Sequence, residues 1–197
     1  MAVATAEELR RFLRRSTAFT AEETAQAELF LSLAQGEIEE EAGQTLDSAT
    51  DTITLDGPAR DEREHHVGTG TRKLILPRWP VTDVASVTLL EDDEILSEGH
   101  DADFTWSQAG IVTRIGAWWP SGDQVIEVVY TAGFVTWPTS LKAMGLRLAA
   151  GAWDNPSRLQ AEKLGDHSRS WTAEALGMEL SDKDRRTIGA YRARTTW

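Results

Sequence analysis

The amino-acid sequence predicts an α+β fold in which a helical connector-like core is interrupted by an inserted antiparallel β region. Two helix-start motifs lie in the first 50 residues, short β-branched segments follow, and a long apolar helix begins after Pro138. We expect one compact domain with four parts: a helix hairpin at 1–50, a β insertion at 51–131, a central helix at 132–155, and a C-terminal arm with a basic helix at 156–197.

Two capping boxes mark the starts of the first two helices. Thr5 and Glu8, like Thr20 and Glu23, have the spacing at which hydroxyl and carboxylate bond the free backbone N–H groups of a first turn. The first helix is expected from Ala6 to about Arg15, and the second is expected to end at Gly43. The first helix is expected to bury Leu9, Phe12 and Leu13, and the apolar stripe of the second consists of Ala27, Phe30, Leu31, Ala34 and Ile38.

The second helix is about twice as long as the first, so its C-terminal half is expected to project past its partner. That half carries four carboxylates, which oppose the dipole of a helix C-terminus. Either water solvates them, or a neighbouring subunit supplies cations. The residues proposed for contacts between subunits are Glu37, Glu39, Glu40 and Glu41, with Arg10, Arg11, Arg14 and Arg15 of the first helix.

Residues 51–131 change to alternating polarity and β-branched side chains, which favour strands. Turns are marked by glycine and proline, and Glu91–Glu94 is expected to be a hairpin tip or an exposed loop. Short strands at this spacing predict an antiparallel sheet, a sandwich or a small barrel. The expected strands are Thr52–Leu55, Lys73–Leu76, Val84–Leu90, Asp103–Ser107, Ile111–Ile115 and Gln124–Tyr130.

The C-terminal third begins with the most apolar helix of the chain. Pro138 suits a first helical turn, and the helix is expected to reach about Trp153 with only Lys142 and Arg147 as charges. It is therefore expected at the centre of the core or between subunits. Residues 166–173 alternate and indicate an extended arm, after which Ser181 and Asp184 cap a basic helix. Trp171 and Trp197 are expected to anchor an interface.

The net charge of −12 is unevenly distributed. Residues 1–138 hold 10 Lys and Arg against 25 Asp and Glu, whereas residues 139–197 hold 10 against 7. An acidic body argues against tight binding of nucleic acid through phosphates. The chain contains no cysteine, which excludes disulfides and cysteine-ligated zinc. No apolar run reaches about 18 residues, and the N-terminus has no apolar signal segment, so we expect no membrane association.

No catalytic, metal-binding or cofactor-binding residues are assigned from the sequence. His65 and His66 lie near Asp61, Glu62 and Glu64, but neighbouring residues of a strand point to opposite faces and no spaced third ligand follows. Gly68-Thr-Gly70 lacks the third glycine of a dinucleotide loop. The chain is therefore not expected to be an enzyme. A metal-dependent hydrolase that uses His65 and His66 is the distant alternative.

Three segments, in this order, resemble a family of virus proteins. They are LPRWPVTDVASV at 76–87, VYTAGF at 129–134 followed by Pro138 and Leu141, and EKLGDHS at 162–168. With the N-terminal helix pair and the closing basic helix, they resemble the head-to-tail adaptors of tailed bacteriophages, also called head-tail connector or head-completion proteins. Related members occur in prophages and gene transfer agents. Minimal members are nearly all helix, so the β insertion departs from the family.

The resemblance implies a structural virion protein of the neck, between capsid and tail, made in the bacterial cytoplasm. Such adaptors form rings of about twelve copies under the portal protein, and DNA passes through the channel without specific binding. A stopper or tail-completion protein would be a further partner, and another neck protein of that type is the alternative identity. The arm would contact the portal, with Gly165, Asp166, His167 and Ser168 in the family-like segment, and with Trp171, Tyr191, Arg192 and Trp197 added on their chemistry.

Overall fold

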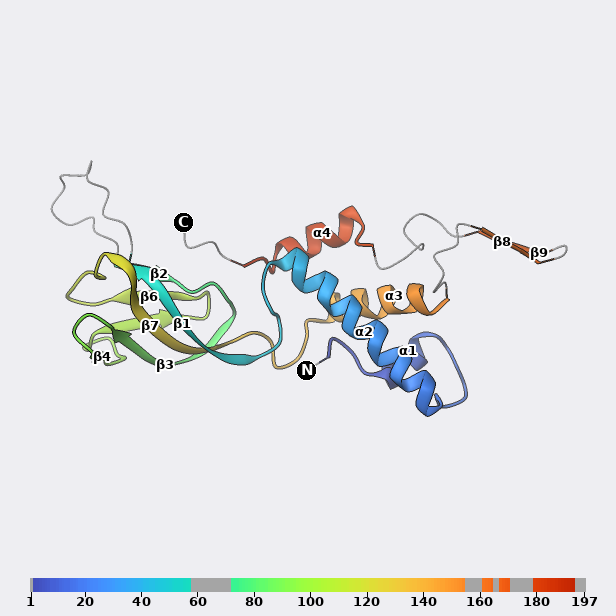
Figure 1. The fold of residues 1–197 in the computed structure, drawn as a ribbon, viewed down its shortest axis with the longest axis horizontal. Coiled ribbons are helices and arrows are strands. Elements are labelled where there is room, and N and C mark those ends of the chain that lie inside the picture. The colour runs from blue at the N-terminus through green and yellow to red at the C-terminus, as the bar shows by residue number, and fades with distance from the viewer. Residues whose placement is uncertain (1, 58–71, 155–160, 165–166, 171–178, 194–197) are drawn as a thin grey trace. The chain divides into compact units, whose positions relative to one another are not determined.

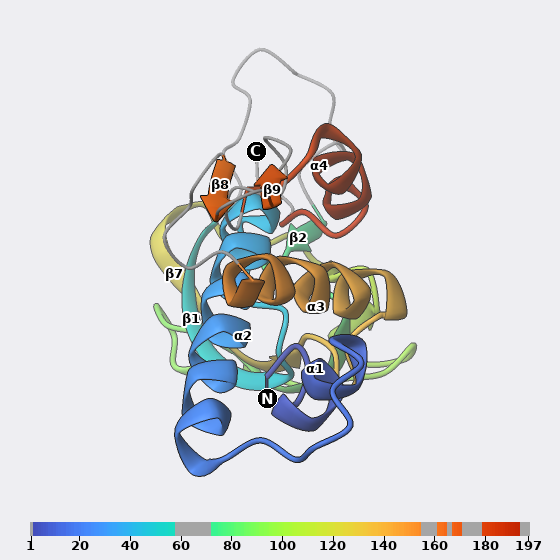
Figure 2. The same cartoon turned by 90° about the vertical axis from the view of Figure 1, so that its right-hand side faces the viewer.

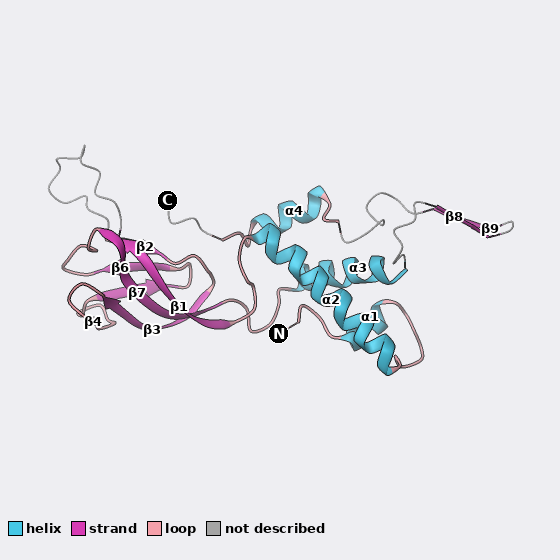
Figure 3. Ribbon diagram, in the orientation of Figure 1, coloured by secondary structure: helices cyan, strands magenta, loops and turns pink. Residues whose placement is uncertain are grey.

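The computed structural model describes residues 2–57, 72–154, 161–164, 167–170 and 179–193 (Figure 1). Its contacts divide the chain into two compact units: a helical unit, made of residues up to 45 and residues 136–192, and a β unit, residues 46–135. Helices α1–α4 belong to the first and strands β1–β7 to the second, and Figure 3 shows the helices in cyan and the strands in magenta. The predicted α+β class is confirmed.

The helical unit contains four described helices: α1 (Ala6–Phe12), α2 (Ala21–Ala42), α3 (Thr139–Asp154) and α4 (Asp182–Gly189). All three predicted capping boxes are present, at Thr5 for α1, Thr20 for α2 and Ser181 for α4. Gly43 ends α2 in the left-handed conformation with φ 65°, as predicted.

Helix α1 is shorter than the sequence predicts. It ends at Phe12, and Arg14 takes a left-handed conformation with φ 57° that turns the chain away. Leu9 is buried, Leu13 is half-buried and Phe12 is 48% exposed, so the prediction that Phe12 belongs to the core is wrong. In this two-turn helix only Leu9 is fully buried in the helical unit, and the Phe12 side chain extends toward solvent.

Helix α3 lies at the centre of the helical unit. Figure 2 shows α3 between α1 and α4, with α2 along one side, and α3 contacts all three. Its buried side chains include Leu141, Met144 and Leu148. Its two basic side chains reach different neighbours: Lys142 pairs with Glu8 of α1, and Arg147 pairs with Asp184 of α4 at 2.5 Å. The first of the two predicted positions for this helix, the centre of the core, is confirmed.

The β unit consists of two antiparallel sheets that share one core. A four-stranded sheet has the order β1-β7-β3-β4, and a three-stranded sheet has the order β2-β6-β5. Buried residues of both sheets, such as Val87, Tyr130, Phe104 and Val112, form one cluster, which makes the unit a sandwich. The strands are β1 (Ala49–Gly57), β2 (Lys73–Ile75), β3 (Val81–Leu89), β4 (Glu94–Leu96), β5 (Phe104–Ser107), β6 (Ile111–Arg114) and β7 (Gly122–Ala132).

Strand β4 is absent from the sequence prediction, because Glu94 belongs to the acidic run at 91–94 and only two apolar residues follow it. Its existence follows from the turn before it: Glu91–Asp93 joins β3 to β4, and Leu89 pairs with Glu94. The predicted hairpin tip is thus confirmed. A further hairpin, β8 (Ala161–Leu164) and β9 (His167–Ser170), pairs Leu164 with His167, so the described part of the predicted extended segment, residues 167–170, is one strand of a hairpin that begins earlier.

The chain enters and leaves the β unit at one place. Leu46 accepts a backbone hydrogen bond from Phe134 at 2.7 Å, and Phe134 accepts one from Ser48 at 3.2 Å. Arg78 closes this junction, because its guanidinium donates to the Asp47 carbonyl oxygen at 2.6 Å and to the Ala132 carbonyl oxygen at 3.2 Å, and it also pairs with Asp51. An insertion with adjacent ends can be accommodated between two helices without disturbing either.

Gly133 is required where the two ends of the insertion meet. Its φ is 105°, and a Cβ atom there would lie 2.3 Å from the Asp47 carbonyl oxygen. Gly133→Ala is therefore expected to lower the free energy of unfolding of the β unit by about 3 kcal/mol or more, from backbone strain and overlap together. Gly116→Ala is the matched control, because Gly116 also has positive φ (72°) but open space around it. It should cost about 1 kcal/mol in urea denaturation. If both variants lose the same unfolding free energy, the close approach of Gly133 to the Asp47 carbonyl oxygen is wrong.

Candidate functional site

The C-terminal end of α2 concentrates negative charge. Glu37, Glu39, Glu40 and Glu41 lie within its last two turns, and α2 has no basic residue in its last turn. Carboxylates there add to the negative end of the helix dipole, so the segment requires cations or solvent. The structure shows how much of this charge is compensated within the chain.

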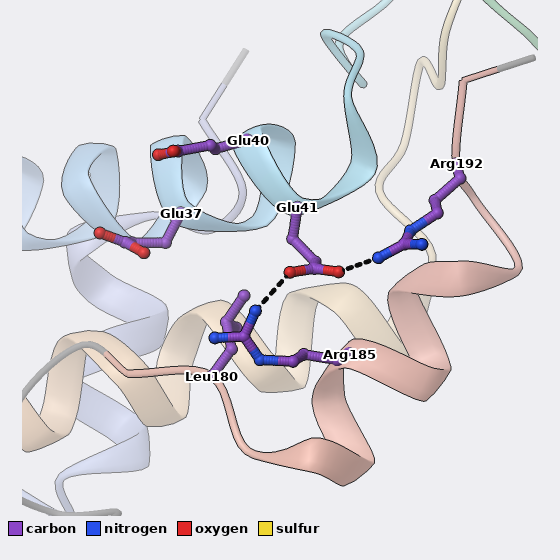
Figure 4. Close-up of a pocket in the computed structure, with 6 residues that line it drawn as sticks. All are labelled: Glu37, Glu40, Glu41, Leu180, Arg185 and Arg192. Carbon is purple, nitrogen blue, oxygen red and sulfur yellow. Dashed lines mark hydrogen bonds and ion pairs between the residues drawn. The ribbon is translucent and has the colours of Figure 1, made fainter. Parts of the chain in front are cut away.

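Glu41 is compensated by helix α4 and the residues that follow it. Arg185 donates to one carboxylate oxygen at 2.6 Å, and Arg192 donates to the other (Figure 4). The Glu41 side chain is only 11% exposed. The hydrogen bond from Arg192, together with the charge of both arginines, lowers the pKa of Glu41. Glu41 thus follows neither alternative proposed from the sequence, because its cations come from the same chain.

Helix α4 is fixed to the unit by apolar contacts as well as by charge. Ile188 is fully buried and Leu180 is 9% exposed. The Gln44 side chain donates to the Tyr191 carbonyl oxygen at 2.7 Å. Burial alone would raise the pKa of Asp184, but hydrogen bonds from Ser181 and the charge of Arg147 lower it. The end of α2 and the beginning and end of α4 therefore form one packed junction.

A polar hollow of about 370 Å³ lies at this junction, within the helical unit. It is lined by Glu37, Glu40, Glu41, Leu180, Arg185 and Arg192. Figure 4 shows that both ion pairs go to Glu41, whereas the Glu40 carboxylate points away from the two guanidinium groups. Among the residues that the structure describes, Glu37 and Glu40 have no ion-pair partner. These exposed carboxylates can accept a basic side chain from another molecule.

Most of the other residues proposed for subunit contacts already have a partner within the chain. Arg10 and Arg11 pair with Glu7, and Arg15 pairs with Glu23 at 2.7 Å. Glu39 accepts a hydrogen bond from Gln35 at 3.2 Å. Arg14 is exposed and has no ion pair with any described residue. Their contacts with a neighbouring subunit stay a prediction, for which Arg14, Glu37 and Glu40 are the most available groups.

The residues proposed for the arm have different positions in the chain. His167 and Ser168 begin strand β9, opposite Leu164 and Lys163 of β8. Tyr191 and Arg192 belong to the junction with α2. The others, Gly165, Asp166, Trp171 and Trp197, lie outside the described residues. Portal binding by any of these residues stays a prediction.

Sequence reasoning did not identify Arg185 as a partner of Glu41, or Lys142 and Arg147 as partners of capping-box acids. The paired residues are 144, 134 and 37 positions apart, so no local spacing could indicate them. The one available signal was compositional: α2 is an acidic helix without Lys or Arg, and the C-terminal segment is basic.

The described residues contain no group of three or more His, Asp or Glu side chains that could hold a metal ion. His65 and His66, with their acidic neighbours, lie outside the described part of the chain. Among the described helices, none is long and apolar enough to span a membrane.

No protein-family model and no curated protein matches the chain. Its fold is similar to chains of three solved structures of gene transfer agent (GTA) particles, each 18% identical. The neck of an empty particle computed with C6 symmetry matches with a TM-score of 0.57 over 99% of this chain and 92% of the other. The virion of a native particle gives 0.59 over 99% and 92%, and the neck of a native particle computed with C12 symmetry gives 0.56 over 98% and 90%.

The compensation of Glu41 can be tested by its dependence on pH. Because pairing lowers the pKa of Glu41 below the ordinary value of 4.5, its stabilisation is complete above that value and is lost as pH falls through the lowered one. Glu41→Gln should therefore lower the melting temperature near neutral pH, and the difference from the wild type should shrink in acid. Glu40→Gln is the matched control and should leave the melting temperature unchanged or slightly raised. A loss for Glu41→Gln that is independent of pH would contradict the ion pairs.

Proposed function

We propose that the chain is a structural protein of a phage-like virion neck, and more specifically a head-to-tail adaptor. In this role, about twelve copies form a ring under the portal protein and join the DNA-filled capsid to the tail. The ring is a conduit for DNA, and a stopper or tail-completion protein is the partner on its other side. The protein acts by assembly and requires no cofactor.

One observation carries this proposal: the likeness to GTA chains covers 98–99% of the chain. It therefore includes the helical unit, the β unit and the order in which they are connected. Two of the three similar structures are necks. The adaptor resemblance of the segments at 76–87, 129–134 and 162–168 supports the same location. A shared fold can serve several functions, so the function is argued from these lines together.

The charge of the chain suits a DNA conduit. Residues 1–138 carry a net charge of −15, and acidic walls repel the phosphate backbone rather than bind it. A channel of this kind lets DNA pass without adhesion. A protein that grips DNA would instead have a basic surface with several phosphate contacts.

We restrict the proposed portal arm to the segment between α3 and α4 for the experiment, because α4 and the residues after it also contact α2. Removing residues 166–197 would abolish portal binding under the adaptor hypothesis, but it would also remove Ile188 and the partners of Glu41 from the helical unit. A deletion that keeps α4 would test portal binding without removing these contacts. The segment that contains hairpin β8–β9 and Trp171 is the part that can be changed separately.

A stopper or tail-completion protein is the alternative within the neck. The similar structures are described as necks, a description that fits both roles. The two roles differ in partner: an adaptor binds the portal, whereas a stopper binds the tail side of an adaptor. A hexameric assembly, or binding to tail components without the portal, would favour the alternative.

The arm hypothesis predicts a selective loss of binding. Asp166→Ala, His167→Ala and Trp171→Ala, combined in the full chain, should abolish binding to the cognate portal in sedimentation or native mass spectrometry. The reason is that aromatic and charged anchors at the centre of an interface contribute most of its affinity. The melting temperature should stay that of the wild type, because α4 and its contacts are intact.

The matched control is Lys183→Ala, an exposed substitution on α4 outside this segment. It should bind the portal as the wild type does. If the triple variant binds normally, the arm assignment is wrong. If the wild type itself binds no portal but binds tail components, the adaptor role is wrong.

A further inference from the structure

The outer face of α2 is an apolar and acidic surface that no described part of the chain covers. Its apolar part is Leu29 and Leu33, which are 56% and 49% exposed. Glu37 and Glu40 continue the same face, since all four residues lie within about 80° on a helix with 100° per residue. The buried side of α2, with Leu31 and Ile38, lies opposite. Two exposed leucines one helical turn apart offer apolar area that a protein partner can bury.

A second surface of the same unit has the opposite charge. The α1 corner consists of Arg11, Phe12 and Arg14 at the end of α1. The Arg11 side chain is 73% exposed, Phe12 is 48% exposed, and Arg14 is exposed. The corner is held in shape by backbone hydrogen bonds from Arg14 to Arg11 at 3.0 Å and from Arg15 to Arg10 at 3.1 Å. It thus exposes one aromatic and two arginine side chains within four residues of the chain, and Arg11 also pairs with Glu7.

The two surfaces complement each other in both chemistry and charge. Phe12 offers apolar area to Leu29 and Leu33, while Arg11 and Arg14 offer cations to Glu37 and Glu40. Helix α2 contains seven glutamates and no Lys or Arg, whereas residues 10–15 contain four arginines. We propose that the outer face of α2 binds the α1 corner of a second copy of this chain. This inference rests on the proposed ring and identifies its interface between subunits.

Charge decides against a symmetric pairing of two α2 faces. Such an isologous contact would pair the acidic face with itself and would bring no cation to Glu37 or Glu40, because α2 contains no Lys or Arg. A contact between α2 and the α1 corner instead places opposite charges together, and a pair of subunits joined in this way still has one free α2 face and one free α1 corner. Repetition of that contact is heterologous, and it closes into a ring when the rotation between subunits permits.

The hollow at the junction of α2 and α4 gives the incoming arginines a defined place. Glu37 and Glu40 line it beside Glu41, whose charge is already held by Arg185 and Arg192. An arginine from the partner would therefore find two carboxylates without a described partner, next to the apolar side chain of Leu180. Arginine suits this position because its planar guanidinium can bond carboxylates while its aliphatic part covers apolar surface.

The experiment uses two full-length variants that reverse one surface each. The face variant carries Glu37→Arg and Glu40→Arg, and the corner variant carries Arg11→Glu and Arg14→Glu. Each variant alone places like charges together, so its self-association, measured by sedimentation velocity, should weaken at least about tenfold. A one-to-one mixture restores opposite charges at every contact and should associate within about threefold of the wild type. Melting temperatures of all variants check that the helical unit is folded.

A third variant, Leu33→Ser, tests the apolar part of the contact. It should weaken association at low and at high salt, whereas the charge effects should diminish in high salt because ions screen exposed pairs. Since Leu33 is half exposed in the single chain, its replacement should change the unfolding free energy little.

The outcomes separate this interface from the proposed function. If the wild type assembles and both reversed variants do so equally well, or if their mixture fails to recover, the interface assignment is overturned while the ring stands. If the face variant self-associates normally but loses binding to the portal or a tail protein, the α2 face belongs to that partner and the inference is wrong. If the wild type forms no ring with or without portal, the proposed function itself fails.

Discussion

The helical unit depends on the way α3 uses its two basic side chains. Lys142 pairs with Glu8, and Arg147 pairs with Asp184. Both acids are also the third-position residues of capping boxes, so each one satisfies the first turn of its own helix and fixes that helix to α3. Local helix formation and tertiary packing are therefore coupled at two points. This arrangement holds α1 and α4 in place although they are short and come from opposite ends of the chain.

The negative charge at the C-terminal end of α2 is compensated only in part within the chain. Glu41 receives two arginines from the C-terminal segment, which offsets part of the negative charge at the end of α2. Glu37 and Glu40 receive none within the described residues, and Leu29 and Leu33 remain exposed beside them. Two carboxylates without a described ion-pair partner, beside two exposed leucines on one helix face, are consistent with a surface that contacts another subunit. The β unit, closed at one junction by Arg78, adds a separate body to that subunit.

Features that depend on residues close together in the sequence could be predicted, whereas contacts between distant residues could not. The three capping boxes, the end of α2 at Gly43, the class of the fold and six strands are local patterns, and the structure confirms them. Phe12 was misplaced because periodicity indicates a face but does not show whether another element covers it. The partner of Glu41 was missed because Arg185 lies 144 residues away, and β4 was missed because its first residue belongs to an acidic run that is typical of a turn. The candidate site is built from such distant pairs, so composition could indicate its charge but not its geometry.

We propose that this chain is a ring-forming subunit of a virion neck that binds the portal. Cryo-electron microscopy of the full-length chain mixed with its cognate portal protein would reveal the assembly itself. We expect a closed ring of about twelve copies on the portal, with the outer face of α2 against the α1 corner of the next copy. A portal without bound chain, or a hexamer bound to tail components alone, would show that the chain is not an adaptor.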